Sequence, residues 1–210
     1  MNIIKPKNLD GAKLEAGILS SLNRDEKVSY YSFENEKCDN AELYEIEFHN
    51  CSFNNICIQN GTLEKITFMD VIFDRCNFSN SEFLECTFVR CQFNNCKVFG
   101  CNFAENRLHH VGFVESNAGY VSFSMASMEN ILFKDTMLNN SYFQENKLKN
   151  LYFDHADLTQ SRFFKTSLKD VDLSSSRIER IAITADDIKG AVIDQFQAVD
   201  LLYLIGVKLK

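Results

Sequence analysis

The sequence lacks tryptophan, has a single proline, and contains no long apolar run. A membrane-spanning helix needs about 20 consecutive apolar residues, so we expect no membrane association. The residues after Met1 also lack the apolar core of a secretory leader, which favours a cytoplasmic location where thiols stay reduced. With a formal net charge of −7, we expect no direct contact with nucleic acid, which needs clustered Lys and Arg.

Phenylalanine, in contrast, is abundant, and sixteen of the 19 recur at intervals of five residues. From Phe33 to Ile183 this central register runs for 31 steps without an insertion, and only Ala118 is too small to fill a core. Two residues before each centre lies a second register of mostly small side chains, and the other three positions are mostly polar. Asn, which tolerates a left-handed backbone, recurs two residues after the centre, at Asn35, Asn40, Asn50, Asn55, Asn60, Asn80, Asn95, Asn130, Asn140 and Asn150.

A period of five fits neither the 3.6 of a helix nor the 2 of a strand. Short extended pieces joined by polar corners would instead wind into a solenoid with large side chains on its axis. Stretches such as "CQFNN", "CNFSN", "SEFLE" and "ADLTQ" resemble the pentapeptide-repeat family over about 150 of the 210 residues. The resemblance implies an all-β fold, a right-handed quadrilateral β-helix of nearly eight coils, about 37 Å long. We expect an N-terminal cap (1–32), the solenoid (33–185) and a C-terminal capping and dimerisation segment (186–210).

The eight cysteines follow this pattern. Cys38 lies on the central register, Cys57 points outward, and six lie on the small inward register. A four-thiolate zinc site would hold each sulfur about 2.3 Å from the ion, but here the axis is filled by central residues. We therefore expect the inward cysteines to be buried as core packing. A disulfide could form only between neighbours one coil apart, such as Cys76 and Cys96, and the reducing cytoplasm would keep both thiols reduced. The inward cysteines are Cys51, Cys76, Cys86, Cys91, Cys96 and Cys101.

Other candidate chemistry is sparse. No phosphate loop, HExxH or GxSxG motif occurs, and a filled solenoid offers no cleft, so we expect no enzyme, metal or cofactor. Asn106 and Asn146 intrude on the small register, where we expect each to satisfy buried backbone groups. At Ala118 either Tyr120 folds inward, the coil bulges or a ligand cavity remains. The histidines are expected to point outward, too far apart to share a metal: His49, His109, His110 and His155.

Residues twenty apart share a face of the expected solenoid, and each face is named here after its first central residue. On the Phe33 face six acidic residues oppose two basic ones, and on the opposite Leu43 face seven oppose three, a formal balance of −4 for each. The Cys38 and Phe48 faces each balance at +1. Either the acidic faces only keep the rod in solution, or they imitate phosphate rows and are drawn into a basic DNA channel. The candidate partner-binding residues are Glu34, Asp74, Glu115, Asp135 and Asp154 on the Phe33 face, and Glu42, Glu45, Glu64, Glu82, Glu85, Glu105 and Glu145 on the Leu43 face.

Both ends of the register need covers. Residues 9–23 predict a short helix, although Gly17 weakens it. After Ile183 a second helix is predicted, with Asp194 and Gln197 as a capping box and Gly206 at its end. This helix is apolar on two sides, one to close the solenoid and one to meet a second copy, and "VKLK" at 207–210 predicts a short strand. We expect homodimerisation through Phe196, Val199, Leu201, Leu202, Tyr203 and Ile205.

The tail is similar to that of the Qnr and MfpA group of pentapeptide-repeat proteins, which dimerise through a C-terminal helix. The resemblance therefore implies a dimer joined in the same way. The resemblance implies a DNA mimic that binds DNA gyrase or topoisomerase IV and protects it from quinolones. Plasmid-type Qnr proteins interrupt their solenoids with loops, whereas this register is continuous. That leaves the MfpA-like, loop-free kind or a relative that does not act on gyrase. The alternative is a protein–protein interaction scaffold with a non-topoisomerase partner. The matching residues are Asp194, Gln197, Ala198, Leu201, Leu202, Gly206 and Val207.

Overall fold

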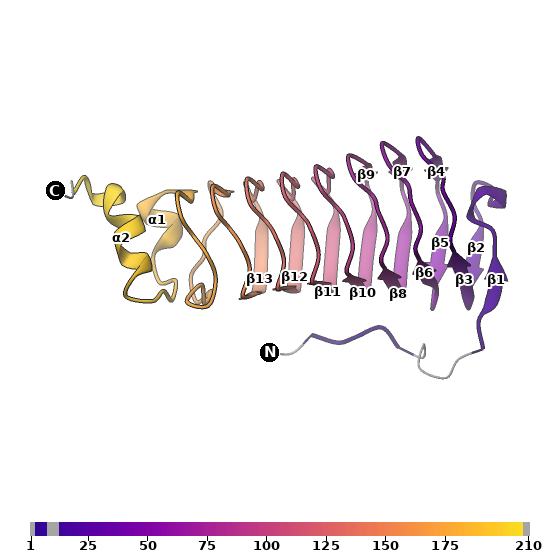
Figure 1. Cartoon of the computed structure of the whole chain (residues 1–210), viewed down its shortest axis with the longest axis horizontal. Helices are drawn as coiled ribbons and strands as arrows, with labels where there is room; N and C mark the ends of the chain where they lie inside the picture. The colour runs from indigo at the N-terminus through magenta and orange to yellow at the C-terminus, as the bar shows by residue number, and fades with distance from the viewer. Residues whose placement is uncertain (1–2, 8–12, 208–210) are drawn as a thin grey trace.

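The computed structural model describes residues 3–7 and 13–207, which form a rod of stacked coils with two short helices at its C-terminal end (Figure 1). Residues twenty apart pair in parallel, so that Phe73 lies beside Phe93 and Phe93 beside Phe113. The rod has about eight coils. The predicted all-β quadrilateral β-helix is therefore confirmed.

Three sheets and rows of single bridges make the four faces. The ten-stranded sheet covers the Phe48 and Phe33 faces because its eight-residue strands bend round the corner between them. It contains β1 (Glu15–Gly17), β2 (Lys27–Ser29), β3 (Tyr31–Glu34), β5 (Glu47–His49), β6 (Ser52–Asn54), β8 (Thr67–Asp74), β10 (Thr87–Asn94), β11 (Arg107–Val114), β12 (Ser127–Lys134) and β13 (Lys147–Asp154). The Leu43 face contains β4 (Glu42–Tyr44), β7 (Thr62–Glu64), β9 (Glu82–Leu84), β14 (Arg162–Phe163) and β15 (Ala182–Ile183). Single bridges in twenty-residue steps join the Cys38 face, from Lys37–Cys57 to Asp157–Arg177.

Phenylalanine rings stack along the axis of the rod. The ring centroids of Phe73 and Phe93 are 4.4 Å apart at an interplanar angle of 13°, and those of Phe93 and Phe113 are 4.7 Å apart at 7°. Rings on adjacent faces meet edge to face, as Phe73 and Phe78 do at 85°. Stacked and edge-to-face pairs are the favoured aromatic geometries, which explains why one residue type recurs on the central register.

The corners explain the polar positions of the repeat. From Asp25 to Arg180 every fifth residue has a positive φ, apart from position 175. All ten asparagines predicted to lie at corners do so, with φ between 52° and 60°. Asn adopts this left-handed conformation more readily than most residues, so its recurrence follows from backbone geometry.

The small register is explained by packing and by one recurring hydrogen bond. All eight cysteines are free, and the six on this register are buried. The Cys101 thiol donates to the carbonyl of Phe78 at 2.7 Å, and the Ser81 hydroxyl makes the equivalent bond to Ile58. Burial raises the pKa of Cys91 and of Cys101 to about 12, so these thiols stay neutral. The prediction of cysteines as core packing is confirmed.

The N-terminal end differs from the prediction. Val28 is buried and β2 pairs with β5, so the coil register begins five residues before Phe33. Instead of the predicted helix, residues 13–23 contain β1 and the 3-10 helix η1 (Leu19–Ser21). Gly17 pairs with Phe33, and an added Cβ would lie 2.5 Å from its ring, so the segment covers the end of the coil as a strand. The part of that prediction on residues 9–12 lies outside the described residues.

The C-terminal cap follows the predicted pattern. After α1 (Ala185–Ile188), the carboxylate of Asp194 accepts the N–H of Gln197 at 2.8 Å, and the Gln197 side chain accepts the N–H of Asp194 at 2.9 Å. This capping box starts α2 (Gln197–Leu201), which continues as the 3-10 helix η2 (Leu202–Ile205) and ends at Gly206 with φ 73°. No helix among the described residues is long and apolar enough to cross a membrane. The strand predicted for 207–210 falls on residues that, after Val207, lie outside the described part.

Candidate partner-binding surfaces

Four exposed carboxylates on the Leu43 face have no ion-pair partner among the described residues: Glu42, Glu82, Glu85 and Glu105. Glu85 and Glu105 occupy the same corner of consecutive coils, about 4.8 Å apart along the rod. Together with Cys86, Thr87 and Arg107 they line a polar hollow of about 260 Å³. Like charges so close repel each other, and a cationic partner would relieve that repulsion.

The other acidic residues on this face are neutralised. Glu45 binds Arg24 at 2.6 Å and Lys65 at 3.5 Å, and the hydrogen bond from Arg24 is the main reason its pKa is lowered. Glu64 lies 3.8 Å from Lys65. Glu145 binds Lys165, one coil further on, at 2.8 Å. The negative potential of the Leu43 face is therefore concentrated at Glu42, Glu82, Glu85 and Glu105.

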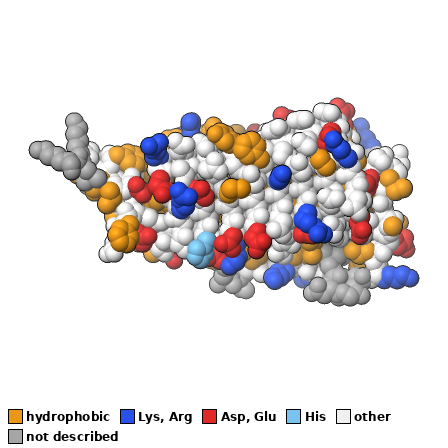
Figure 2. Space-filling model, viewed as in Figure 1, with side chains coloured by type: hydrophobic (Ala, Val, Ile, Leu, Met, Phe, Trp, Pro, Cys, Tyr) orange, Lys and Arg blue, Asp and Glu red, His pale blue; other side chains and the backbone are white. Residues whose placement is uncertain are grey.

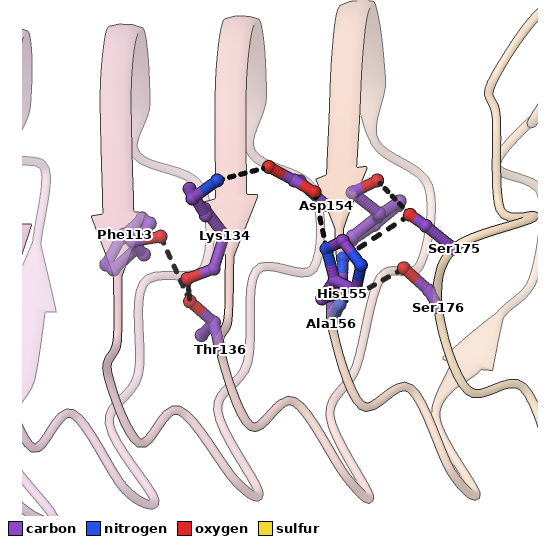
Figure 3. A network of polar contacts seen from close by, with 9 residues as sticks. Phe113, Lys134, Thr136, Asp154, His155, Ala156, Ser175 and Ser176 are labelled. Atoms are coloured by element: carbon purple, nitrogen blue, oxygen red, sulfur yellow. Dashed lines mark hydrogen bonds and ion pairs between the residues drawn. The ribbon is translucent and has the colours of Figure 1, made fainter.

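On the Phe33 face, Asp154 is held between two bases (Figure 3). Its two carboxylate oxygens lie 2.7 Å from Lys134 Nζ and 2.7 Å from His155 Nδ1. The hydrogen bond from Lys134, and then that from His155, lowers the pKa of Asp154. Asp74 is paired with Arg75 at 3.0 Å. Neither carboxylate is thus a free charge.

Three predicted residues on this face, Glu34, Glu115 and Asp135, have no ion pair among the described residues. Glu115 and Asp135 share a corner in consecutive coils, as Glu85 and Glu105 do. We call these the Glu115 pair and the Glu85 pair. With four corners per coil, the two pairs lie at diagonally opposite corners. They form two separated rows of negative charge.

The charge density of the rod is moderate. Over about 38 Å, duplex DNA carries roughly 22 phosphate charges, whereas each acidic face of this protein balances at −4. On the side visible in Figure 2, acidic and basic side chains lie next to one another along the rod. Any competition with DNA would therefore depend on a few uncompensated carboxylates.

A second exposed surface lies at the C-terminal end. Phe196, Val199 and Tyr203 are 76%, 52% and 50% exposed, whereas Leu201 and Leu204 pack against the core. Leu201, predicted to meet a second copy, therefore lies on the side that closes the solenoid, and Leu202 is half-buried. The side chain of Ile205 lies outside what the structure describes. Homodimerisation through the exposed side stays a prediction.

The structure decides two further points. Tyr120 does not fold inward: it is 49% exposed, while Ala118 stays in regular pairing, its N–H bonded to Met137 at 2.7 Å. His110 is not outward-facing but buried beneath residues 3–7.

The two intruding asparagines behave differently. Asn106 satisfies two buried backbone groups, donating to the Phe83 carbonyl and accepting the N–H of Cys86. Asn146 donates to the Phe123 carbonyl, but its own Oδ1 is buried without a partner among the described residues. The prediction is thus confirmed in full for Asn106 and in part for Asn146.

Sequence reasoning missed one aromatic feature on the Cys38 face. The exposed rings of Phe99 and Tyr120 lie 5.3 Å apart. A Cβ added at Gly119 would lie 3.3 Å from the Phe99 ring, so the glycine makes room for it. Two aromatic residues at outward positions one coil apart were the available signal.

Known proteins share this architecture. The family model that describes the pentapeptide repeat region matches this sequence at residues 66–143 and 86–163. HetL, a pentapeptide repeat protein involved in heterocyst differentiation regulation from the cyanobacterium Nostoc, is 12% identical with a TM-score of 0.50, over 81% of this chain and 84% of its own. QnrB1, a plasmid-mediated fluoroquinolone resistance protein, is 16% identical with a TM-score of 0.42, over 94% and 96%.

A pentapeptide repeat protein from the Arabidopsis thaliana thylakoid lumen is 15% identical with a TM-score of 0.28, over 61% and 72%. No curated protein sequence matches significantly. The likeness to HetL, at 12% identity, concerns the fold alone. Residues 66–143 and 86–163 thus belong to a pentapeptide repeat region, and the left-handed corners of the same twenty-residue coils continue on both sides of it.

Proposed function

We propose that this protein binds the basic, DNA-binding surface of a type II topoisomerase, DNA gyrase or topoisomerase IV, and thereby protects the enzyme from quinolones. The observation that carries the proposal is the placement of the Glu85 and Glu115 pairs, two rows of uncompensated carboxylates on opposite corners of an uninterrupted rod. Lys and Arg side chains that hold phosphates would pair with them, and the same charges would steer the encounter.

The C-terminal surface supports the proposal. Asp194, Gln197 and Gly206 match the tail of dimeric Qnr and MfpA proteins and form the cap of α2. Apolar side chains as exposed as Phe196 and Val199 are suited to burial against a second copy. Joining two rods end to end would present rows of carboxylates on both sides of a two-fold axis, a symmetry that suits a two-fold symmetric enzyme.

The test is gyrase supercoiling in the presence of ciprofloxacin, with this protein titrated from zero to a few-fold excess. We expect supercoiling to recover at low dose and to be inhibited at high dose. A variant with Glu82, Glu85 and Glu105 changed to Lys should lose both effects. The matched control changes three carboxylates of the Cys38 face, Asp39, Asp157 and Glu179, to Lys and should keep them. Equal behaviour of the two variants would refute specific recognition of the acidic corner.

The second candidate is a scaffold with a non-topoisomerase protein partner, and the exposed Phe99 and Tyr120 pair favours it. Exposed aromatic residues are enriched at the energetic centres of protein interfaces, and this face has no acidic excess. If the folded wild-type protein affects neither topoisomerase, this candidate stands. If changing Phe99 and Tyr120 to Ala abolishes the gyrase effect, the aromatic pair belongs to the topoisomerase interface instead.

A further inference from the structure

One column of outward positions on the Phe33 face is unusually apolar. Ile72, Gln92, Gly112, Leu132 and Tyr152 stand next to one another in the parallel register. Outward side chains of this repeat are otherwise mostly polar, yet Leu132 is only 9% exposed and Gly112 is buried. The cover is supplied by residues 3–7, here called the strap, from the far end of the chain.

The strap runs along the rod axis, across the strands rather than parallel to them (Figure 1). The N–H of Lys7 donates to Asp70 Oδ1 at 2.8 Å, and the N–H of Ile4 donates to His110 Nδ1 at 3.0 Å. Asp70 and His110 share one corner, two coils apart, a separation of about 9.6 Å. Three extended residues span about 10 Å. The strap therefore matches the coil spacing at three residues for every two coils.

The side chains of the strap divide between the groove and the solvent. Ile3 and Pro6, three residues apart, are half-buried, whereas Ile4, Lys5 and Lys7 are exposed. Together with Lys5 and Ile4 they line a hollow of about 220 Å³ with Cys91, Gln92, Gly112, Val114 and Leu132. Pro6 is the single proline of the chain; its ring restricts φ, and the residue before a proline is driven to an extended conformation.

The acceptors for the strap are also held by side chains of the rod. Asp70, 5% exposed, is bound by two nitrogens of Arg90 at 2.6 and 2.5 Å. His110, 8% exposed, contacts the side-chain amide of Asn130 through Nε2 at 3.3 Å, and Asn150 donates to Asn130 at 2.8 Å. This corner is thus a ladder of polar groups in which Asp70 and His110, both buried, accept from the strap.

We propose that this ladder and the neighbouring apolar column form a binding groove for an extended peptide, and that the chain's own residues 3–7 are its occupant. The groove selects apolar side chains at two positions three residues apart and bonds the backbone N–H groups that follow each of them. The unfilled space beside Ile3 and Pro6 shows that the strap does not exhaust the site. The groove is lined by none of the carboxylates on which the proposed function rests.

Binding in this groove requires neutral His110, because Nδ1 must accept an N–H. Burial lowers the pKa of His110, and the neighbouring His109 and Arg90 lower it further, while Glu129 opposes them. Asp70 and the strap residues Lys5 and Lys7 are the other charges along the groove. Protonation would place a second donor against the Ile4 N–H, so occupancy of the groove is favoured above the His110 pKa and weakens as the pH falls through it.

The test uses the full chain and a fluorescent peptide with the sequence of residues 1–8, followed by anisotropy. In the wild type the tethered strap competes at an effective concentration on the order of millimolar, so the peptide should bind at least tenfold more weakly than to Ile3→Asp, whose strap cannot dock. Adding Gly112→Val to Ile3→Asp should make peptide binding weak again, because the valine side chain would occupy the groove. The rod itself has room for it, since the nearest atom to a new Cβ is 3.9 Å away. Matching urea midpoints would verify that all three chains fold.

Binding that is no tighter to Ile3→Asp than to the wild type, or equally tight after Gly112→Val, would overturn the groove. In Ile3→Asp the peptide should bind more weakly in acid than at pH 8. With His110→Gln added, that dependence should disappear; an unchanged pH profile would remove His110 from the site. Since no topoisomerase is present, failure here would leave the proposed function untouched.

Discussion

Asn106 and Asn146 occupy the same register position two coils apart, but changing each to Ala should have very different effects on stability. The Asn106→Ala change removes the side-chain partners of the Phe83 carbonyl and the Cys86 N–H, both inside the rod. Leaving a buried backbone group without its partner costs about 1–3 kcal/mol. For two groups we expect a loss of about 3 kcal/mol or more in the free energy of unfolding.

The Asn146→Ala change should cost little. The Phe123 carbonyl that accepts from Asn146 also accepts the N–H of Ala126 at 3.1 Å, so it keeps a partner. The substitution also removes Oδ1 of Asn146, a buried acceptor without a partner among the described residues. The two effects oppose each other, and we expect a net change within about 1 kcal/mol of zero.

Urea and thermal unfolding of the two variants provide the assay. Both substitutions remove the same side-chain atoms, so the cavity contributions largely cancel in the comparison. A loss of about 3 kcal/mol corresponds to a fall of roughly 6–12 °C in Tm for a chain of this size. Equal destabilisation by the two substitutions would refute the reasoning, because the contribution of Asn106 would then come from packing and not from the bonds between coils.

Three further predictions concern the corners and the C-terminal end. Met125 holds φ 59° at an exposed corner, so Met125→Asn should stabilise the rod by up to about 1 kcal/mol, seen as a higher urea midpoint. Burial raises the pKa of Asp70, but Arg90 and Lys7 together outweigh it and the pKa is lowered; Arg90→Met should therefore cost about 2 kcal/mol at pH 7, a loss that shrinks as the pH falls below about 4. Changing Phe196 and Val199 to Glu should halve the mass measured by light scattering without unfolding the chain; an unchanged mass would exclude this dimer interface.

The repeat itself could be predicted from the sequence because each position has one physical requirement. Phenylalanine on the central register predicts rings stacked along the axis, and Phe73 and Phe93 stack in this way. Asparagine two residues later predicts a corner with left-handed backbone, as found at Asn95. Both signals are local and recur in every coil, so 31 repetitions make them unambiguous.

The sites were less predictable because they depend on contacts between distant residues. Summing charges by face could not reveal that Asp154 is bound by Lys134 and His155, because pairing depends on side-chain geometry. The strap lies outside the register, so its position over Gly112 is a tertiary property of residues far apart in the chain. The apolar outward column with the lone Pro6 was the signal that could have indicated it.

The most direct test of the proposed function is displacement of DNA from gyrase. A fluorescent duplex bound to the enzyme would be titrated with this protein, and its anisotropy followed at two salt concentrations. We predict release of the duplex, less complete at the higher salt because the contacts are between exposed charges, and no release by the chain with Glu82, Glu85 and Glu105 changed to Lys. Retention of the duplex at saturating amounts of folded wild-type protein would contradict the account.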